Sequence, residues 1–356
     1  MTKSEQITNI ISEKFFLKQY IHSDVYVKKE AQESEFCDCM IEFDEFYVVI
    51  QIKERNTDAE GDSRKWFEKK VLKKAKKQIK DTFAYYEDNA NTIFSKTKDV
   101  KIDRKKKLLP LIIFLNTDIE KYERVVYSES LRSDINIFSF HDFAIMLETI
   151  VIPYDILNYL SYRTVFRNVA EGNLFIDTID ENATMLSIPK NEKDYADFFL
   201  ARTYYKCIIE QLIEEDNICI YNQIVSEINS VINYERSALV EGLLCVDYVR
   251  ADKIAKNWLK LLECARNEQY VEPYKIFKDE KVYMFAVHPK GMSTEEYLTR
   301  LNLSMIYCKY KWGCQFAYVI TIRYVEGEQY MLGVHDFDSV ERYDELVDKV
   351  VEAYEG

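Results

Sequence analysis

Asp38, Gln51 and Lys53 are three polar residues whose types could together hold a divalent cation and activate water. A carboxylate and an amide oxygen are ligands for a hard cation such as Mg²⁺, which keeps several of its waters, and the main-chain carbonyl of Ile52 offers one more oxygen. An ammonium group beside that cation can orient the nucleophilic water, accept its proton if the lysine pKa is lowered, or neutralise charge on a scissile phosphate. We therefore expect Mg²⁺, with Mn²⁺ as a substitute, wherever these side chains meet.

A predicted β-hairpin would bring them together. Residues 36–43 and 46–53 are rich in strand-forming residue types, and the two residues between them, at 44 and 45, have the length of a tight turn. With that turn, facing residues have numbers that sum to 89, so Asp38 lies opposite Gln51. Because side chains alternate along a strand, Lys53 shares their face.

Helices and further strands surround the hairpin in the sequence. Apolar residues at helical spacing over 4–20 predict a first helix, which carries Glu13, and residues 25–30 form a short strand before the hairpin. A long amphipathic helix is predicted from about residue 62 to residue 86. The apolar run at 108–115 then reads as a buried strand, so the order is typical of an α/β domain with a mixed sheet flanked by helices.

The remaining chain predicts a second domain. The first domain, residues 1–165, ends after a strand at 135–140 and two helices, and a polar linker spans 166–192. The second domain, residues 193–356, is predicted to be helical as far as residue 268 and α+β after it. Its expected strands are 281–287, 315–325 and 329–335, with helices near 293–309 and 340–354.

Asp38 followed by Gln51-Ile52-Lys53 resembles the PD-(D/E)xK nuclease superfamily, which has the restriction-endonuclease-like fold. The resemblance covers roughly residues 4–150, where the predicted order of helix, three strands, helix and strand is similar to the core of that family. It implies an Mg²⁺-dependent endonuclease in which Asp38, Gln51 and Glu13 hold the metal and Lys53 acts on the attacking water. A glutamate on the first helix often joins the metal site of the family, and Glu13 is at that position.

The chain departs from the family pattern in two ways. Cys37 replaces the motif proline, and Gln51 replaces the more frequent acid, as in a QxK branch. Gln51 removes one negative charge, which implies weaker metal affinity or dependence on Glu13 and on Glu42. Gln78 lies beside the apolar stripe of the long helix and could point toward the site. The QxxxY motif of the exonuclease branch is not matched, because residue 82 is a threonine.

Charge is distributed unevenly along this acidic chain. The net charge is -13, yet residues 51–107 hold 18 Lys and Arg against 10 Asp and Glu. Residues 64–80 contain nine of these cations and one acid. A solvated helix face is the ordinary explanation of such a run, but cations without matching acids repel one another and favour a phosphate backbone as partner. We expect nucleic-acid contacts from Lys69, Lys70, Lys73, Lys74 and Lys77.

Other residue types exclude several classes of protein. The eight glycines lack the spacing of a P-loop, a dinucleotide fingerprint or a nucleophile elbow, and no histidine has an HExxH context. The eight cysteines show no paired CxxC spacing, which favours reduced thiols. No apolar signal region opens the sequence, and the longest apolar run is far short of a membrane span. We expect a cytoplasmic protein that does not bind membranes.

These observations lead to an expected function and its alternatives. The first is DNA hydrolysis, in the setting of restriction or antiviral defence that the resemblance implies, by a homodimer or by a subunit of a defence complex. The second is a non-catalytic interaction or regulatory subunit that retains the nuclease fold but has lost competent metal binding, which Gln51 makes plausible. The structural alternative to the motif itself is that Gln51 and Lys53 merely end a strand near solvent. A ribonuclease is a third, because the motif residues alone do not separate RNA from DNA.

Overall fold

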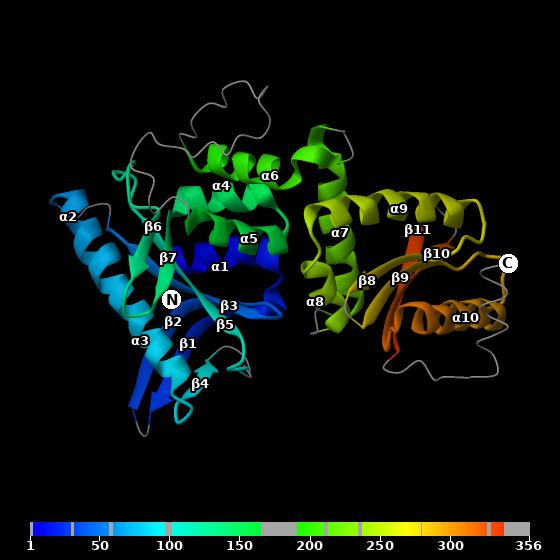
Figure 1. The fold of residues 1–356 in the computed structure, drawn as a ribbon, viewed down its shortest axis with the longest axis horizontal. Coiled ribbons are helices and arrows are strands. Elements are labelled where there is room, and N and C mark those ends of the chain that lie inside the picture. Colours follow the sequence, from blue (N-terminus) through cyan, green and yellow to red (C-terminus); the bar gives the residue numbers. More distant parts are fainter. Residues whose placement is uncertain are drawn as a thin grey trace. The chain divides into compact units, whose positions relative to one another are not determined.

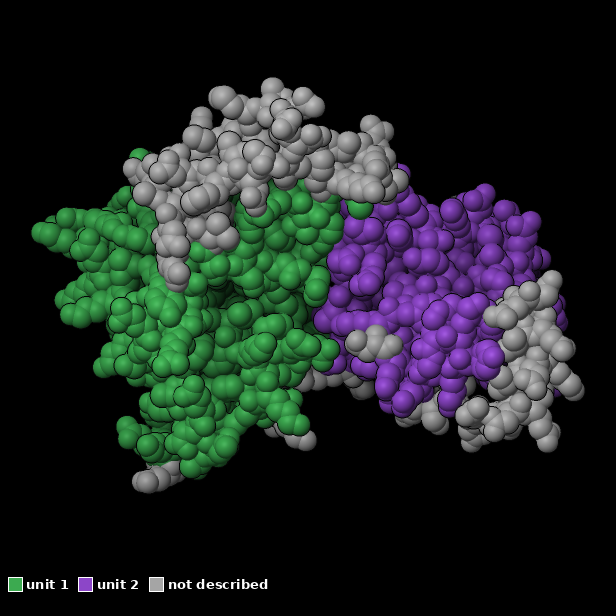
Figure 2. Space-filling model, viewed as in Figure 1, with its two compact units in different colours: residues 1–210 green, residues 211–356 purple. Residues whose placement is uncertain are grey.

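The computed structural model of the 356-residue chain divides into two compact units, Met1–Glu210 and Gln211–Gly356, which Figure 2 distinguishes by colour. The structure describes residues 3–29, 32–56, 60–96, 102–164, 191–209, 213–233, 237–278, 280–325 and 329–337. Within these ranges, no helix combines the length and the hydropathy that crossing a membrane requires.

A seven-stranded mixed sheet forms the centre of the first unit (Figure 1). Its strands lie in the order β4-β1-β2-β3-β5-β7-β6. The first three strands of the chain form an antiparallel meander, β5 runs parallel to β3, and β7 runs parallel to β5. The bounds are β1 Ile21–Lys29, β2 Gln32–Glu42, β3 Phe46–Glu54, β4 Thr92–Ser95, β5 Lys107–Leu115, β6 Val125–Ser128 and β7 Ser133–Ser139.

Helices cover both faces of this sheet, as the predicted α/β architecture requires (Figure 1). On one face, an apolar core joins α1 (Lys3–Phe16), α4 (Phe140–Ile150), α5 (Pro153–Tyr162) and α6 (Glu192–Ile209) to the sheet. On the other face, a second core joins the sheet to a continuous helix made of α2 (Ser63–Phe67), the π-helix η2 (Glu68–Ala75) and α3 (Lys76–Glu87). A short 3-10 turn, η1 (Lys18–Tyr20), links α1 to β1.

The continuous helix agrees with the long amphipathic helix that the sequence predicts, except for its π-helical middle. Asp62 caps its start by accepting hydrogen bonds from two backbone N–H groups of the first turn. In an α-helix, a stripe of residues four apart drifts around the axis by about 40° per step, because 3.6 residues complete a turn. A π-helix has more residues per turn, since it bonds residue i to i+5. The π segment therefore keeps Phe67, Val71, Ala75 and Ile79 fully buried on one line.

The first unit also differs from the sequence prediction in three places. The short strands β4 and β6, at the two edges of the sheet, were not predicted. The compact unit includes α6, whereas the sequence assigns residues from 193 onward to the second domain. The reason lies in Ala196 and Phe199, which complete the apolar core under α4 and α5. Most of the predicted linker at 166–192 lies outside the described residues.

The second unit is helical first and mixed afterwards, as predicted. Its helices α7 (Glu215–Val231), α8 (Ala238–Leu244) and α9 (Tyr248–Arg266) precede a four-stranded sheet of order β11-β10-β9-β8. The strands are β8 Tyr274–Lys278, β9 Lys281–Val287, β10 Phe316–Val325 and β11 Gln329–Phe337, and α10 (Thr294–Trp312) connects β9 to the parallel β10. β8 was not predicted, and the helix expected near 340–354 lies outside the described residues.

Candidate functional site

The candidate site forms where β2 and β3 separate. Their pairing runs from Glu42 opposite Tyr47 to Cys39 opposite Ile50, in the predicted register, and β3 then continues along β5. Asp38 is the first residue beyond this ladder. Its carboxylate oxygen Oδ2 accepts a hydrogen bond from the backbone N–H of Ile52. A side chain thus bridges the two strands at the point where their backbones part.

The three side chains singled out by the sequence converge around one ammonium group. Lys53 Nζ donates to the carbonyl oxygen of Ile52 at 2.7 Å and to Gln51 Oε1 at 3.4 Å. It also lies 3.5 Å from Asp38 Oδ2. Three oxygens from two strands therefore face a single cationic atom.

This cluster is largely removed from solvent. Gln51 is 1% exposed and Asp38 is 8% exposed, while Lys53 is half-buried. Burial raises the pKa of Asp38 from its ordinary value to about 6. The neighbouring ammonium of Lys53 and the hydrogen bond from Ile52 act in the opposite direction, and a second carboxyl group, that of Glu35, adds to the rise.

Glu35 and Gln78 belong to the surroundings of Asp38. Glu35 interacts with the Asp38 carboxyl group and contributes to the rise of its pKa. Gln78, on α3, donates from Nε2 to Glu35 Oε2 at 3.5 Å. The amide oxygen of Gln78 is buried, and no hydrogen-bond partner faces it within the described part of the chain. The sequence suggested that Gln78 points toward the site, whereas Glu35 was missed because simple alternation places it on the face opposite Asp38.

The structure does not bring Glu13 into this cluster. α1 packs on the sheet face that carries Ile50 and Ile52, whereas Gln51 and Lys53 point to the other face. Within the described ranges, Glu13 forms no hydrogen bond or ion pair. Glu42 is also elsewhere, near the hairpin turn, where it contacts His22 Nε2 at 3.0 Å and Lys106 Nζ at 2.9 Å.

The donor atoms of the cluster fit a hard divalent cation held by few protein ligands. Among the described residues, no group of three His, Cys, Asp or Glu side chains is arranged to hold a metal. The available set is instead mixed: the Asp38 carboxylate, the Gln51 amide oxygen and the Ile52 carbonyl oxygen. All three are oxygens, which Mg²⁺ and Mn²⁺ accept, and Mg²⁺ completes its coordination with water. The single buried carboxylate indicates modest affinity.

The five lysines predicted to contact nucleic acid are all exposed. In the part of the chain that the structure describes, none of them forms an ion pair with an acid. They belong to the helix that covers the sheet face toward which Gln51 and Lys53 point, and Gln78 on the same helix reaches Glu35. The lysine helix, residues 63–87, and the cluster around Lys53 therefore lie on one side of the sheet.

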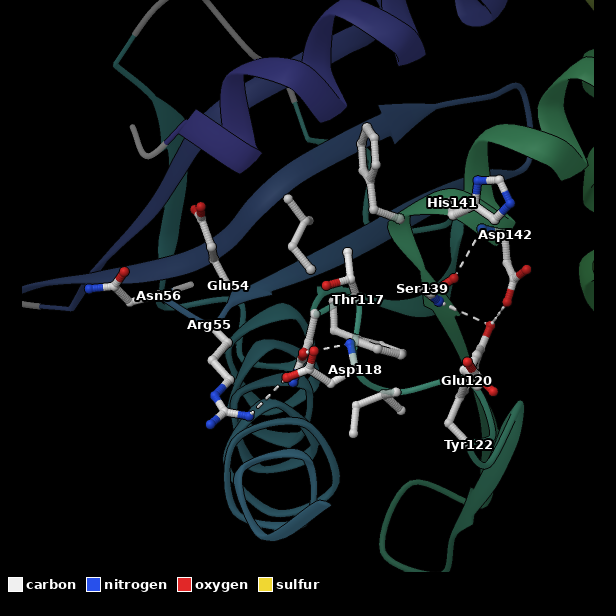
Figure 3. Close-up of a pocket in the computed structure, with 15 residues that line it drawn as sticks. Glu54, Arg55, Asn56, Thr117, Asp118, Glu120, Tyr122, Ser139, His141 and Asp142 are labelled. Atoms are coloured by element: carbon white, nitrogen blue, oxygen red, sulfur yellow. Dashed lines mark hydrogen bonds and ion pairs between the residues drawn. The ribbon is translucent and has the colours of Figure 1, made fainter. Parts of the chain in front are cut away.

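A pocket of about 570 Å³ lies at the carboxyl ends of the parallel strands β3, β5 and β7 (Figure 3). Its lining starts at Glu54, the residue after Lys53, but includes none of the three clustered side chains. Arg55 turns toward Asp118, 3.7 Å away, and its other bonds reach Ser63 and Gly61. The pocket has four carboxylates and one arginine, so its charge disfavours a phosphate group. The four acids are Glu54, Asp118, Glu120 and Asp142.

Comparison of the chain with family profiles, with curated proteins and with solved structures finds no match. The functional interpretation therefore depends on the side chains at the separation of β2 and β3 and on the lysine helix that covers the same face.

Proposed function

We propose that this protein is a metal-dependent endonuclease that hydrolyses DNA phosphodiester bonds, with a QxK form of the PD-(D/E)xK site. The observation that carries the proposal is the convergence of Asp38, Gln51 and Ile52 oxygens on Lys53 Nζ. The order of elements supports it, since α1, the meander of β1 to β3, the lysine helix and β5 follow one another as in the core of that superfamily.

Each residue of the cluster has a role that its contacts support. Asp38, Gln51 Oε1 and Ile52 O would hold one Mg²⁺ or Mn²⁺. A bound divalent cation supplies charge that lowers the pKa of water and polarises a phosphoryl oxygen. Lys53, held near Asp38, donates to the attacking water or to a non-bridging phosphate oxygen and so stabilises developing negative charge. Asp38 also positions the ammonium group, because the two are in contact on neighbouring strands.

The lysine helix supplies the proposed contacts to DNA. Its exposed ammonium groups neutralise backbone phosphates, which gives affinity without sequence information. Cutting both strands of a duplex takes two sites, so the proposal includes a homodimer or a subunit of a larger defence complex. The setting in restriction or antiviral defence follows from the resemblance of the motif.

One observation favours a non-catalytic interaction protein as a second candidate. Among the residues that the structure describes, one carboxylate, that of Asp38, pairs with Lys53, and residue 51 is a neutral glutamine. A fold that has lost one acid of its site can persist as a binding or regulatory subunit. The two candidates differ in one measurable property, which is metal-dependent cleavage.

The test is incubation of the protein with supercoiled plasmid, single-stranded DNA and RNA, with Mg²⁺, Mn²⁺ or EDTA. The parent is compared with Asp38→Asn and Lys53→Met, which remove charge with little change of shape, and with Glu33→Gln on the exposed start of β2 as the matched control. We expect metal-dependent DNA cleavage that both site variants reduce by at least about 100-fold. The control should cleave as the parent does.

Three outcomes contradict the proposal. Cleavage that survives both site substitutions would place the chemistry elsewhere. A folded parent that cuts no nucleic acid with either metal would favour the non-catalytic candidate, whereas cleavage of RNA alone would make the protein a ribonuclease. Circular dichroism and thermal unfolding establish that each variant is folded.

A further inference from the structure

A β-bulge in β2 sets the orientation of Glu35. Along β1, Val25 pairs with Cys37, but the next residue, Tyr26, pairs with Glu35. Phe36 is therefore an extra residue in β2 without an opposite partner on β1. In a regular strand, residues three apart point to opposite faces. The extra residue reverses this parity, so Glu35 returns to the face of Asp38; bulges commonly re-aim side chains in this way beside active sites.

The bulge is fixed by contacts with the lysine helix. Phe36 and Cys37 are both buried in the core under the lysine helix, although neighbours in a regular strand would point apart. The hydroxyl of Thr82, on α3, donates to the carbonyl oxygen of Phe36. The carbonyl group at the bulge thus has a partner on the helix. The position of Glu35 therefore depends on how β2 packs against α3.

Glu35 contacts the cluster at its solvent side. Its carboxyl group interacts with that of Asp38, and Gln78 Nε2 donates to its Oε2 at 3.5 Å. The side chain is exposed, whereas Asp38 is buried. Across the described residues, no lysine or arginine pairs with Glu35, and Lys53 is the one ammonium group that pairs with Asp38. Two adjacent carboxyl groups therefore share one positive charge.

We propose that Glu35 supplies the second carboxylate ligand of the divalent cation, in the role that the sequence suggests for Glu13. With Asp38 it gives the site a net charge of about -1 after Lys53 is counted, whereas Asp38 and Lys53 alone are neutral, so Glu35 makes the site attractive to a divalent cation. Glu13 lies on a helix that covers the opposite face of the sheet. This inference rests on the proposed function, because it assigns one more residue to the same metal site.

The experiment measures Mn²⁺ binding to the metal-free full-length protein by isothermal titration calorimetry and by the electron paramagnetic resonance signal of free Mn²⁺. The variants are Glu35→Gln, Asp38→Asn and Glu13→Gln. Glu33→Gln is the matched control, because Glu33 is an exposed glutamate two residues earlier on β2 that pairs with Lys96 at 3.4 Å. Glu35 is exposed, so its substitution leaves the core intact, and thermal unfolding without metal verifies this.

We expect Glu35→Gln to raise the dissociation constant for Mn²⁺ by at least about 10-fold, because fewer charged ligands weaken binding. Asp38→Asn should weaken it at least as much, and the other two variants should bind as the parent does. Binding that Asp38→Asn weakens and Glu35→Gln leaves unchanged overturns the inference while the metal site stands. A loss of binding in Glu13→Gln overturns it in favour of the first helix. A folded parent that binds no Mn²⁺ overturns both the inference and the proposed function.

Discussion

The ammonium group of Lys53 lies 3.5 Å from the carboxylate of Asp38, on two strands that have already separated. The backbone ladder between β2 and β3 ends at Cys39, so this contact and the bond from Ile52 N–H to Asp38 connect the strands beyond it. The side chain of Asp38 is 5% exposed and that of Lys53 is 13% exposed. Each of these two charges is therefore stabilised mainly by the other, because neither group is fully hydrated.

Replacing Lys53 by methionine should destabilise the protein and make it more responsive to metal. The substitution leaves the Asp38 carboxylate without its cation, and breaking a partly buried pair costs about 2–3 kcal/mol at pH 8. Urea unfolding in EDTA measures this loss. Added Mn²⁺ should restore more stability to Lys53→Met than it adds to the parent, because the metal provides the missing positive charge.

The double variant Asp38→Asn/Lys53→Met is the control for this prediction. It removes both charges and keeps similar shapes, so it should be more stable than Lys53→Met alone and should gain little from Mn²⁺. If the double variant were destabilised by the sum of the two single changes, the two groups would not be coupled, and the pair would have no part in the cation site.

The pKa of Asp38 gives a pH dependence with a definite sign. Burial raises this pKa to about 6 in the folded protein, above the unfolded value near 3.8. The folded state therefore binds a proton more tightly, so the stabilisation is fully present below about pH 4 and is lost as pH rises through 6. The difference corresponds to about 3 kcal/mol. Chemical denaturation in EDTA at pH 4 and pH 8 should show the parent losing this amount relative to Asp38→Asn.

A flat difference between parent and Asp38→Asn across that range would contradict the assignment of the shift to Asp38. Glu33→Gln on the same strand provides the comparison, since its side chain is exposed and is paired with Lys96. It should follow the parent at both pH values.

The lysine helix should control the salt dependence of DNA binding. Lys74 and Lys77 are exposed and lie one turn before and immediately before Gln78, the residue that contacts Glu35. Each phosphate contact contributes about 0.9 to the slope of log K against log salt on duplex DNA. Lys74→Gln/Lys77→Gln should therefore reduce the slope by about 2 in fluorescence anisotropy measured in EDTA.

Lys253→Gln/Lys260→Gln is the matched control, because both residues are exposed lysines of α9 in the second unit. The same net charge is removed, so an equal effect of the two double variants would mean that the total charge, and not the lysine helix, determines binding.

Turn length and strand alternation were sufficient to predict how the hairpin residues of the candidate site are placed. A two-residue turn fixes the register, and the period of two along a strand then places Asp38, Gln51 and Lys53 on one face. Strand alternation does not predict the orientation of Glu35, because the bulge at Phe36 interrupts it. That bulge depends on the packing of Phe36 against the lysine helix and on its bond from Thr82, which are contacts with residues about 46 positions away.

The first helix shows a different limit of sequence patterns. Ile10, one of the apolar residues of this helix, is 67% exposed, whereas the polar Thr8 and Ser12 are fully buried. A helix with polar residues on its packed side cannot be oriented from its apolar residues alone. The position of Glu13 relative to the sheet therefore needed the tertiary structure.

The packing of α6 predicts where the chain can be truncated without unfolding the first unit. Arg163 is fully buried and bonds to both carboxylate oxygens of Glu192, which also accepts from Tyr159 and Arg124. A fragment of residues 1–210 keeps this network and should unfold cooperatively. A fragment of residues 1–165 leaves Arg163 without its carboxylate and should lack a cooperative thermal transition in circular dichroism. In the full chain, Glu192→Gln should cost about 3 kcal/mol. Equal melting of both fragments would contradict the role of α6.

The proposed metal site predicts that residue 51 controls the affinity for the cation. Its amide oxygen is 3.4 Å from Lys53 Nζ in a nearly solvent-free position, so Gln51→Glu adds a second buried charge beside Asp38. Without metal, this desolvated carboxylate should lower the free energy of unfolding by about 2 kcal/mol. With Mn²⁺, the added charge should tighten binding by about 10-fold, because ligand charge sets affinity at oxygen sites.

Gln51→Met completes the comparison, because methionine has a similar volume and no oxygen ligand. Mn²⁺ should raise the melting temperature most in Gln51→Glu, less in the parent and least in Gln51→Met. Because all three side chains occupy the same buried position, differences in packing alone would change the melting temperature without metal but not its response to Mn²⁺. Equal responses in the three proteins would show that the side-chain oxygen of residue 51 does not contact the cation. The proposed site would then have no side-chain ligand from β3.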